Sequence, residues 1–247
     1  MSDEIKAVIY DAGGTLLRGR PTIDEMCDIA YDEFEVYVEP DQLKEAMPDL
    51  SAFYHQRRHQ DGLGVYDSDE RAASFWREYY LEAFRRAGIE HEQELLLKLA
   101  TRLNRWYAEP EQWQVYDDAW LALEEGRRRG LIQGVVSDWG TDLLGILGSL
   151  GLTQYFEFVV VSAIVGRAKP AADVFEYALE RAGVSAAEAV YVGDSYIADV
   201  LGARGAGLLP VLVDRHGHNH TFDCITVPTL DRVFDSLTPA PAGVAPS

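Results

Sequence analysis

The chain has 247 residues, enough for one large hydrophobic core or for a core domain with a smaller companion. Its 41 acidic and 22 basic residues give a net charge of −19, which argues against nucleic acid and anionic membrane surfaces as general partners. The two cysteines fit no metal or redox spacing, no apolar run approaches the ~20 residues of a membrane span, and the acidic start MSDEIK is unlike a signal peptide, so we expect a cytoplasmic protein.

The first informative stretch is IKAVIYDAGGTLL, residues 5–17. Residues 7–11 are predicted to form a short buried strand that ends in the carboxylate of Asp11. Gly13 and Gly14 then permit a tight turn before Thr15. A carboxylate at the carboxyl end of a buried strand lies where open α/β sheets bind ligands, although the same pattern also fits an ordinary strand and turn.

Residues 18–114 are predicted to be helical, with no pattern typical of a central strand. The helical stripes cover residues 21–38, a segment that opens at Pro40, residues 68–88 and residues 92–107. Four consecutive helices can pack as a small bundle of their own. Most of the aromatic residues in this region are expected in the core of that bundle, with one or two facing a site.

From Val115 onwards, helices and strands are predicted to alternate. The expected helices cover residues 117–129, 142–150, 171–182 and 199–205, and the expected strands cover residues 131–137, 156–162, 189–193, 209–214 and 224–227. This alternation favours a mostly parallel sheet with helices on its faces. We therefore expect an α/β core domain from residues 1–17 and 115–237, with residues 18–114 inserted above Asp11. The Pro- and Ala-rich residues 238–247 are expected to be a disordered tail.

Three later stretches place polar residues at or after predicted strands. They are Val135-Val136-Ser137-Asp138, the segment Gly166 to Pro170 with Lys169, and Tyr191-Val192-Gly193-Asp194-Ser195 followed by Asp199. Each stretch taken alone also fits a purely structural interpretation. Four such stretches in this order, with a helical insertion after the first, favour one shared site. Trp139, directly after the second stretch, is a candidate to line that site.

The set resembles the haloacid dehalogenase superfamily, whose phosphatases, dehalogenases and related enzymes use an aspartate nucleophile. The resemblance covers residues 5 to about 235, and VGDSYIADVLGARGAG, residues 192–207, is its most specific part. Residues 144–179 are similar to the dehalogenase-like branch, and the helical insertion is similar to the cap of that branch. The resemblance implies a Rossmann-like, mostly parallel α/β core with an inserted helical cap domain.

The resemblance also implies a role for each matching residue. Asp11 would be the nucleophile, and a carboxylate is already ionised near pH 7, so this step needs no base. Thr15 and Ser137, with Asp138 beside them, would bind substrate oxygens. Lys169 would offset the negative charge of the nucleophile and of a phosphoryl group.

A metal site follows from the same resemblance. Mg²⁺ would be held by Asp11, the backbone carbonyl of Gly13 and Asp194, with Asp199 behind them, since oxygen ligands suit this ion. The implied substrate is a small phosphorylated molecule, and the implied assembly is a monomer or a homodimer.

Gly13 departs from the pattern of the family's phosphatases, which usually carry a second aspartate two residues after the nucleophile. That aspartate protonates the leaving group, so a phosphatase without it is expected to be slow on alkyl phosphates. Asp138 is the nearest alternative carboxylate in the sequence.

Two alternatives to a Mg²⁺-dependent phosphatase stay open. The family's dehalogenases also lack the second aspartate, need no metal and lack the acidic ligand that Asp194 supplies. A catalytically weak protein that binds a ligand or a partner is the other alternative. We give most weight to Asp194 and Asp199, because these carboxylates facing Asp11 would repel one another without a cation.

Overall fold

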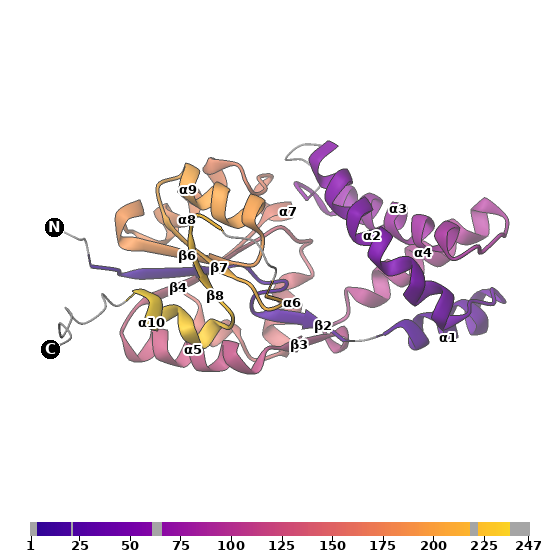
Figure 1. Cartoon of the computed structure of the whole chain (residues 1–247), viewed down its shortest axis with the longest axis horizontal. Helices are drawn as coiled ribbons and strands as arrows, with labels where there is room; N and C mark the ends of the chain where they lie inside the picture. Colours follow the sequence, from indigo (N-terminus) through magenta and orange to yellow (C-terminus); the bar gives the residue numbers. More distant parts are fainter. Residues whose placement is uncertain (1–3, 21, 61–65, 218–221, 238–247) are drawn as a thin grey trace, which may run out of the picture.

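The structure, a computed structural model, describes residues 4–20, 22–60, 66–217 and 222–237. Figure 1 shows a sheet covered by helices and, at the right of the view, a separate group of helices. The tail 238–247, expected to be disordered, lies outside the described residues. Among the described residues, none of the helices combines the length and the apolar character that a membrane span requires.

Six strands form the central sheet in the order β5-β4-β1-β6-β7-β8, and every neighbouring pair is parallel. They are β1 Ala7–Tyr10, β4 Ile132–Ser137, β5 Phe158–Val161, β6 Ala189–Gly193, β7 Leu209–Val213 and β8 Ile225–Val227. The predicted mostly parallel sheet is confirmed. Because β1 lies between β4 and β6, the strand order reverses at β1, and the carboxyl ends of these three strands meet where such sheets bind ligands.

Alternating residues of β1 pack on opposite faces of the sheet, as the two-residue period of a strand requires. Val8 and Tyr10 belong to the apolar core under one face, and Ala7 and Ile9 belong to the core under the other. The first core is completed by the helices α5 Asp117–Arg128, α6 Leu143–Ser149 and α10 Val233–Leu237. The second core is completed by α8 Ala172–Ala182 and α9 Gly202–Gly205.

Shorter helical turns connect these elements. They are η2 Pro110–Gln112, η3 Thr153–Tyr155, α7 Ser162–Val165, η4 Ala186–Glu188, η5 Tyr196–Leu201 and η6 Leu230–Arg232. The helix predicted over residues 199–205 begins earlier, at Tyr196, with the π-helical segment η5, whose first turn is capped by the Ser195 side chain. Asp194 and Ser195 separate β6 from η5, and η5 carries Asp199 to the carboxyl end of the sheet.

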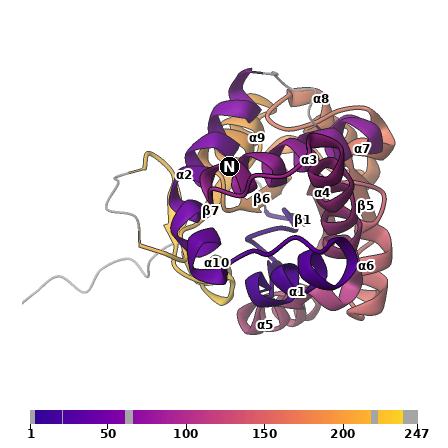
Figure 2. The ribbon, with the colours of Figure 1, turned by 90° about the vertical axis from the view of Figure 1, so that its right-hand side faces the viewer.

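The inserted segment contains the four predicted helices. They are α1 Ile23–Phe34, α2 Pro40–Gln60, α3 Asp69–Arg86 and α4 Gln93–Tyr107. Ser68 caps α3 by accepting a hydrogen bond from the Arg71 backbone N–H at 3.3 Å. Leu99 and Leu103 of α4 are fully buried in a core that these helices share, separate from both cores of the sheet. Figure 2 looks from the helical end, with these helices in front and the strands of the sheet behind them.

Two features of the inserted segment differ from the sequence prediction. Helix α1 ends at Phe34 rather than near residue 38, because Glu35 adopts a left-handed φ of 56°. The segment also begins and ends in strands that were not predicted. The strands β2 Leu17–Gly19 and β3 Trp113–Val115 pair antiparallel, so the chain enters and leaves the helical part through one two-stranded ribbon.

Candidate active site

A cavity of about 1300 Å³ lies between the carboxyl ends of the strands and the helical segment. Its lining combines residues of the sheet's loops with residues of α2, α3 and α4. Seven of the eight predicted site residues line it: Asp11, Gly13, Ser137, Asp138, Lys169, Asp194 and Asp199. The fold therefore brings together predicted site residues that lie up to 188 positions apart in the sequence.

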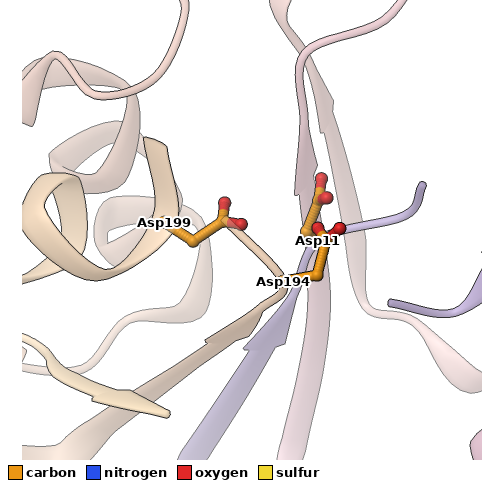
Figure 3. Close-up of side chains that lie close together, drawn as sticks. All are labelled: Asp11, Asp194 and Asp199. Carbon is orange, nitrogen blue, oxygen red and sulfur yellow. The ribbon is translucent and has the colours of Figure 1, made fainter. Parts of the chain in front are cut away.

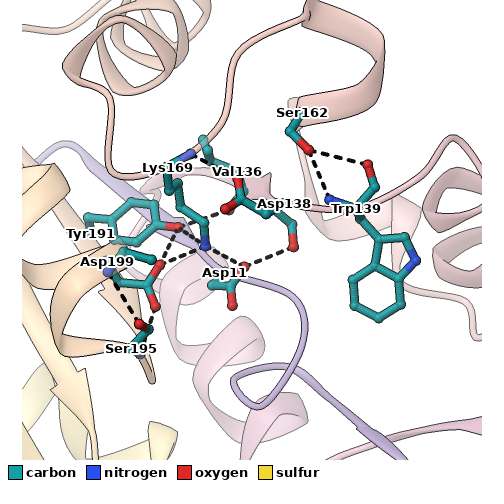
Figure 4. A network of polar contacts seen from close by, with 11 residues as sticks. Asp11, Val136, Asp138, Trp139, Ser162, Lys169, Tyr191, Ser195 and Asp199 are labelled. Carbon is teal, nitrogen blue, oxygen red and sulfur yellow. Dashed lines mark hydrogen bonds and ion pairs between the residues drawn. The ribbon is translucent and has the colours of Figure 1, made fainter. Parts of the chain in front are cut away.

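Asp11 follows β1 and is held from two sides. Its Oδ1 accepts a hydrogen bond from the Ser137 hydroxyl at 2.8 Å and forms an ion pair with the Lys169 ammonium, also at 2.8 Å. Figure 4 shows the contact between Lys169 and one oxygen of Asp11, and no dashed line reaches the other oxygen. Burial raises the pKa of Asp11 to about 6, although Lys169 and Ser137 act in the opposite direction. Two donors thus orient one oxygen and leave the second for attack.

Lys169 is buried between two carboxylates. Its Nζ lies 2.8 Å from Asp11 and 2.6 Å from Asp199, and it donates to the Tyr191 hydroxyl at 3.2 Å. Burial by itself would lower the pKa of Lys169, but the charges of Asp11 and Asp199 raise it well above the usual value. The ammonium therefore stays charged, and it lies beside the oxygen of the candidate nucleophile.

A cluster of three carboxylates faces the cavity. One oxygen each of Asp11, Asp194 and Asp199 lies within 4.8 Å of the others. Figure 3 shows the Asp11 and Asp194 carboxylates next to each other, with the Asp199 carboxylate turned toward them. Partial desolvation and the negative charges of Asp11 and Asp199 raise the pKa of Asp194 to about 8. Lys169 offsets only one of the three charges, so the cluster suits a hard divalent cation such as Mg²⁺.

Both carboxylate oxygens of Asp199 have partners within the protein. Its Oδ1 is paired with Lys169, and its Oδ2 accepts a hydrogen bond from the Ser195 backbone N–H at 2.8 Å. Its side chain is 1 % exposed. These contacts fix both Lys169 and the start of η5, whose neighbouring loop carries Asp194.

Two predicted substrate-binding residues have other partners in this structure. The Ser137 hydroxyl donates to Asp11, and the Asp138 Oδ1 accepts a hydrogen bond from the Lys169 backbone N–H at 2.9 Å. Thr15 is fully buried and does not line the cavity, and its hydroxyl has no hydrogen-bond partner among the described residues. The prediction that Thr15 binds substrate oxygens therefore stays a prediction.

Two residues that support the site were not singled out from the sequence. Tyr191 lies within β6, and its hydroxyl donates to the Val136 carbonyl at 2.9 Å while accepting from Lys169. Arg215 follows β7 and donates to the carbonyls of Gly14 and Thr15 at 3.0 and 2.7 Å. Tyr191 thus provides a hydrogen-bond partner for Lys169, and Arg215 holds the loop that follows Asp11.

Gly14 permits the close approach of Asp194 to this loop. Its φ is +74°, and a Cβ atom built on it would lie 2.2 Å from Oδ2 of Asp194. The Gly14→Ala variant is therefore expected to lose more stability than the roughly 1–2 kcal/mol of a left-handed alanine, and to displace the Asp194 carboxylate. Urea unfolding, together with the rise in melting temperature caused by Mg²⁺, measures the two effects.

Gly151 provides a matched control, because its φ is +73° and a Cβ atom there would meet nothing within 4 Å. Gly151→Ala is expected to show the backbone cost alone and to keep the response to Mg²⁺. Equal losses of stability in the two variants, with the Mg²⁺ response kept in both, would contradict the role of Gly14.

Gly13 faces an aromatic side chain. A Cβ atom on Gly13 would lie 3.0 Å from Cζ3 of Trp139, so the indole takes the space beside this residue. The backbone N–H of Trp139 donates to the Ser162 hydroxyl, and its Nε1 donates to the Asp142 carboxylate, both at 3.0 Å. Trp139 also lines the cavity, as predicted from its position in the sequence.

Comparison with known proteins gives the same family as the motifs. Residues 5–207 match the model of the haloacid dehalogenase-like hydrolases. The haloacid dehalogenase-like hydrolase domain-containing protein 3 of Danio rerio is 32 % identical over 240 residues, which cover 96 % of either chain. The phosphoserine phosphatase of Thermus thermophilus is 36 % identical over 146 residues, 58 % of this chain and 56 % of its own length.

Among solved structures, a HAD phosphatase from Thermococcus onnurineus superposes with a TM-score of 0.64 at 27 % identity, over 94 % of this chain and 97 % of its own. The parallel sheet, the aspartate that follows β1 and the family match over more than four-fifths of the chain all agree. The chain therefore belongs to the haloacid dehalogenase-like hydrolases.

Proposed function

We propose that the protein is a Mg²⁺-dependent phosphatase-type hydrolase that transfers the phosphoryl group of a small-molecule monoester to Asp11. The observation that carries this proposal is the group of three carboxylates around one buried lysine at the cavity floor. The relatives whose names describe them as phosphatases support the same reaction class. The inserted residues 18–114 would act as a cap domain over the core formed by residues 1–17 and 115–237.

The side chains divide the work of this reaction. Asp11 attacks the phosphorus atom through the oxygen that its two donors leave unused, and Ser137 keeps the carboxylate in its orientation. Lys169 offsets the charge that gathers between the nucleophile and the phosphoryl oxygens. Asp11, the Gly13 carbonyl and Asp194, with Asp199 behind them, would hold Mg²⁺, which when bound shields the repulsion between two anions.

Metal dependence separates this proposal from a dehalogenase-type reaction. Gly13 fits both reactions, since neither a halide nor a weakly basic leaving group such as p-nitrophenoxide or acetate needs a proton. The cluster around Asp194 favours phosphoryl transfer, because three carboxylates with oxygens within 4.8 Å of one another repel, and a divalent cation would offset that repulsion. Hydrolysis of p-nitrophenyl phosphate and acetyl phosphate is therefore expected with Mg²⁺ and not with EDTA. Turnover of a 2-haloacid in EDTA, without turnover of either phosphate, would contradict the proposal.

Asp194→Asn tests the metal site without relying on turnover. In EDTA this variant is expected to melt about 2–4 °C above the wild type, because it removes one of three crowded negative charges. Added Mg²⁺ is expected to raise the melting temperature of the wild type and to leave that of the variant almost unchanged. Asp28→Asn, at an exposed position of α1, is the control and should behave as the wild type. A full Mg²⁺ response in Asp194→Asn would show that Asp194 is not a ligand.

A further inference from the structure

Several aromatic rings line the part of the cavity beyond the carboxylates. Tyr54, Trp76, Tyr80 and Tyr107 come from the helical segment, and Trp113 and Trp139 come from β3 and the loop after β4. A phosphoryl group occupies only the floor next to Asp11, so most of the ~1300 Å³ is left for the rest of the substrate. Rings of this kind provide flat apolar surfaces, on which other rings pack well.

Three of these rings form a continuous row that ends beside the nucleophile loop. The centroids of Tyr107 and Trp113 lie 5.0 Å apart, and those of Trp113 and Trp139 lie 4.5 Å apart, both in edge-to-face contact. Trp139 then lies against Gly13, at the position where a side chain of residue 13 would point. A leaving group bonded to a phosphorus atom at Asp11 would therefore meet an indole instead of a carboxylic acid.

Because residue 13 carries no acid, the chemistry of the leaving group also favours an aromatic substrate. An alkoxide is a strong base and leaves poorly unless it is protonated, whereas a phenoxide leaves as an anion. Asp138, the alternative carboxylate considered from the sequence, already accepts a hydrogen bond from the Lys169 backbone. Ring packing and leaving-group chemistry are independent arguments, and both favour an oxygen atom attached to an aromatic ring.

The charges of the lining restrict the substrate further. Among the described residues that line the cavity, the cationic ones are Arg18 and Lys169, and Lys169 is already paired with Asp11 and Asp199. Asp69 and Asp142 add carboxylates to the wall beside Trp139. A second phosphate or carboxylate on the leaving group would thus lie among rings and negative charges.

We propose that the preferred substrates are aryl phosphates, that is, phosphate monoesters of a phenol-like hydroxyl on an apolar ring system without a second anionic group. This inference rests on the proposed phosphatase function. An Asp11 oxygen forms a bond to phosphorus as the bond from phosphorus to the aryl oxygen breaks, and the aryloxide leaves with the electron pair and takes a proton from solvent. Water then attacks the phosphorus of the aspartyl phosphate, Asp11 regains its carboxylate, and the proton of the water stays with the released phosphate or passes to solvent.

Four substrates separate the contribution of the ring from that of the leaving group. 1-Naphthyl phosphate has both a ring and a good leaving group, 2-phenylethyl phosphate has only a ring, acetyl phosphate has only a good leaving group, and glycerol phosphate has neither. We expect kcat/KM for 1-naphthyl phosphate to exceed that for 2-phenylethyl phosphate by at least about 100-fold. We also expect it to exceed that for acetyl phosphate by about tenfold.

A variant of the row of rings tests the assigned contact. In Trp139→Leu, the ratio of kcat/KM for 1-naphthyl phosphate to that for acetyl phosphate is expected to fall about tenfold, and in Trp139→Phe it should recover in part. Trp120→Leu is the matched control, because Trp120 packs against Tyr155 and is not among the residues that line the cavity.

The outcomes distinguish this inference from the proposed function. Turnover of acetyl phosphate that requires Asp11, with no preference for 1-naphthyl phosphate or with equal turnover of 2-phenylethyl phosphate, would overturn the aryl phosphate inference alone. An unchanged ratio in Trp139→Leu would overturn it as well. Absence of turnover of all four phosphates would instead contradict the phosphatase function itself.

Discussion

In the Asp11→Asn variant, turnover of p-nitrophenyl phosphate is expected to fall by roughly 10⁴-fold or more. Asparagine keeps the size of the side chain and an oxygen that can accept from Ser137 and Lys169, but its amide is a very poor nucleophile. The covalent route is then lost, while the cavity stays intact. Wild-type protein quenched in acid during turnover should carry one phosphoryl group on the peptide that contains Asp11, and the variant should carry none.

Asp138→Asn is the matched control for this experiment. It makes the same chemical change in the same cavity, and the asparagine oxygen can still accept from the Lys169 backbone N–H. We expect its turnover to stay within about tenfold of the wild type, because that hydrogen bond positions a loop and transfers no proton. A loss as large as that of Asp11→Asn, with normal phosphorylation of Asp11, would show that Asp138 performs the missing acid–base role.

The second large effect is expected when a carboxylic acid is introduced at residue 13. The contact between Gly13 and Trp139 requires that Trp139 be changed as well. Gly13→Asp alone places its side chain against an indole whose Nε1 donates to Asp142, so this single variant is expected to gain little. Gly13→Asp combined with Trp139→Ala has room for the new carboxyl group. Its turnover of 2-phenylethyl phosphate should exceed that of Trp139→Ala by on the order of 100-fold, since general acid catalysis typically contributes about 10²–10⁴-fold.

The double variant Gly13→Asn with Trp139→Ala supplies the comparison, because its amide has the same shape and transfers no proton. Steady-state kinetics of the three variants on one alkyl phosphate measure the difference. Equal rates for the Asp and Asn double variants, in proteins with normal melting temperatures, would show that the absent acid is not what limits this enzyme.

The sequence predicted the sheet and most of the cavity floor because both depend on local patterns. Short apolar runs between helical segments identify all six strands of the central sheet, and Asp11, Ser137 and Asp194 lie at or directly after the ends of three of those runs. Tyr191 was missed because it lies inside the apolar run of β6, where the residue type suggests core packing. Only the pairing of β6 with β1, which aligns Tyr191 with Ile9, brings its hydroxyl to Lys169.

Long-range contacts and very short elements were beyond prediction from the sequence. The strands β2 and β3 have three residues each, too few to show a periodicity, and the 93 residues 20–112 separate them in the sequence. The contact of Trp139 with Gly13 also joins distant parts of the chain. The sequence predicted that Trp139 lies near the site. Only the structure shows that its indole ring lies 3.0 Å from where a Cβ atom of residue 13 would be.

Because β2 and β3 pair, the helical segment between them could be replaced as one unit. Leu17 pairs with Val115 and Gly19 pairs with Trp113, so the two points at which the segment joins the core are neighbours in space. Five of the cavity's rings belong to the segment between these points, whereas Asp11, Lys169 and Asp194 belong to loops of the core. If the helical segment of a relative replaced this one at the β2–β3 junction, the rings that it contributes to the cavity would change. The reactive residues of the core would stay in place.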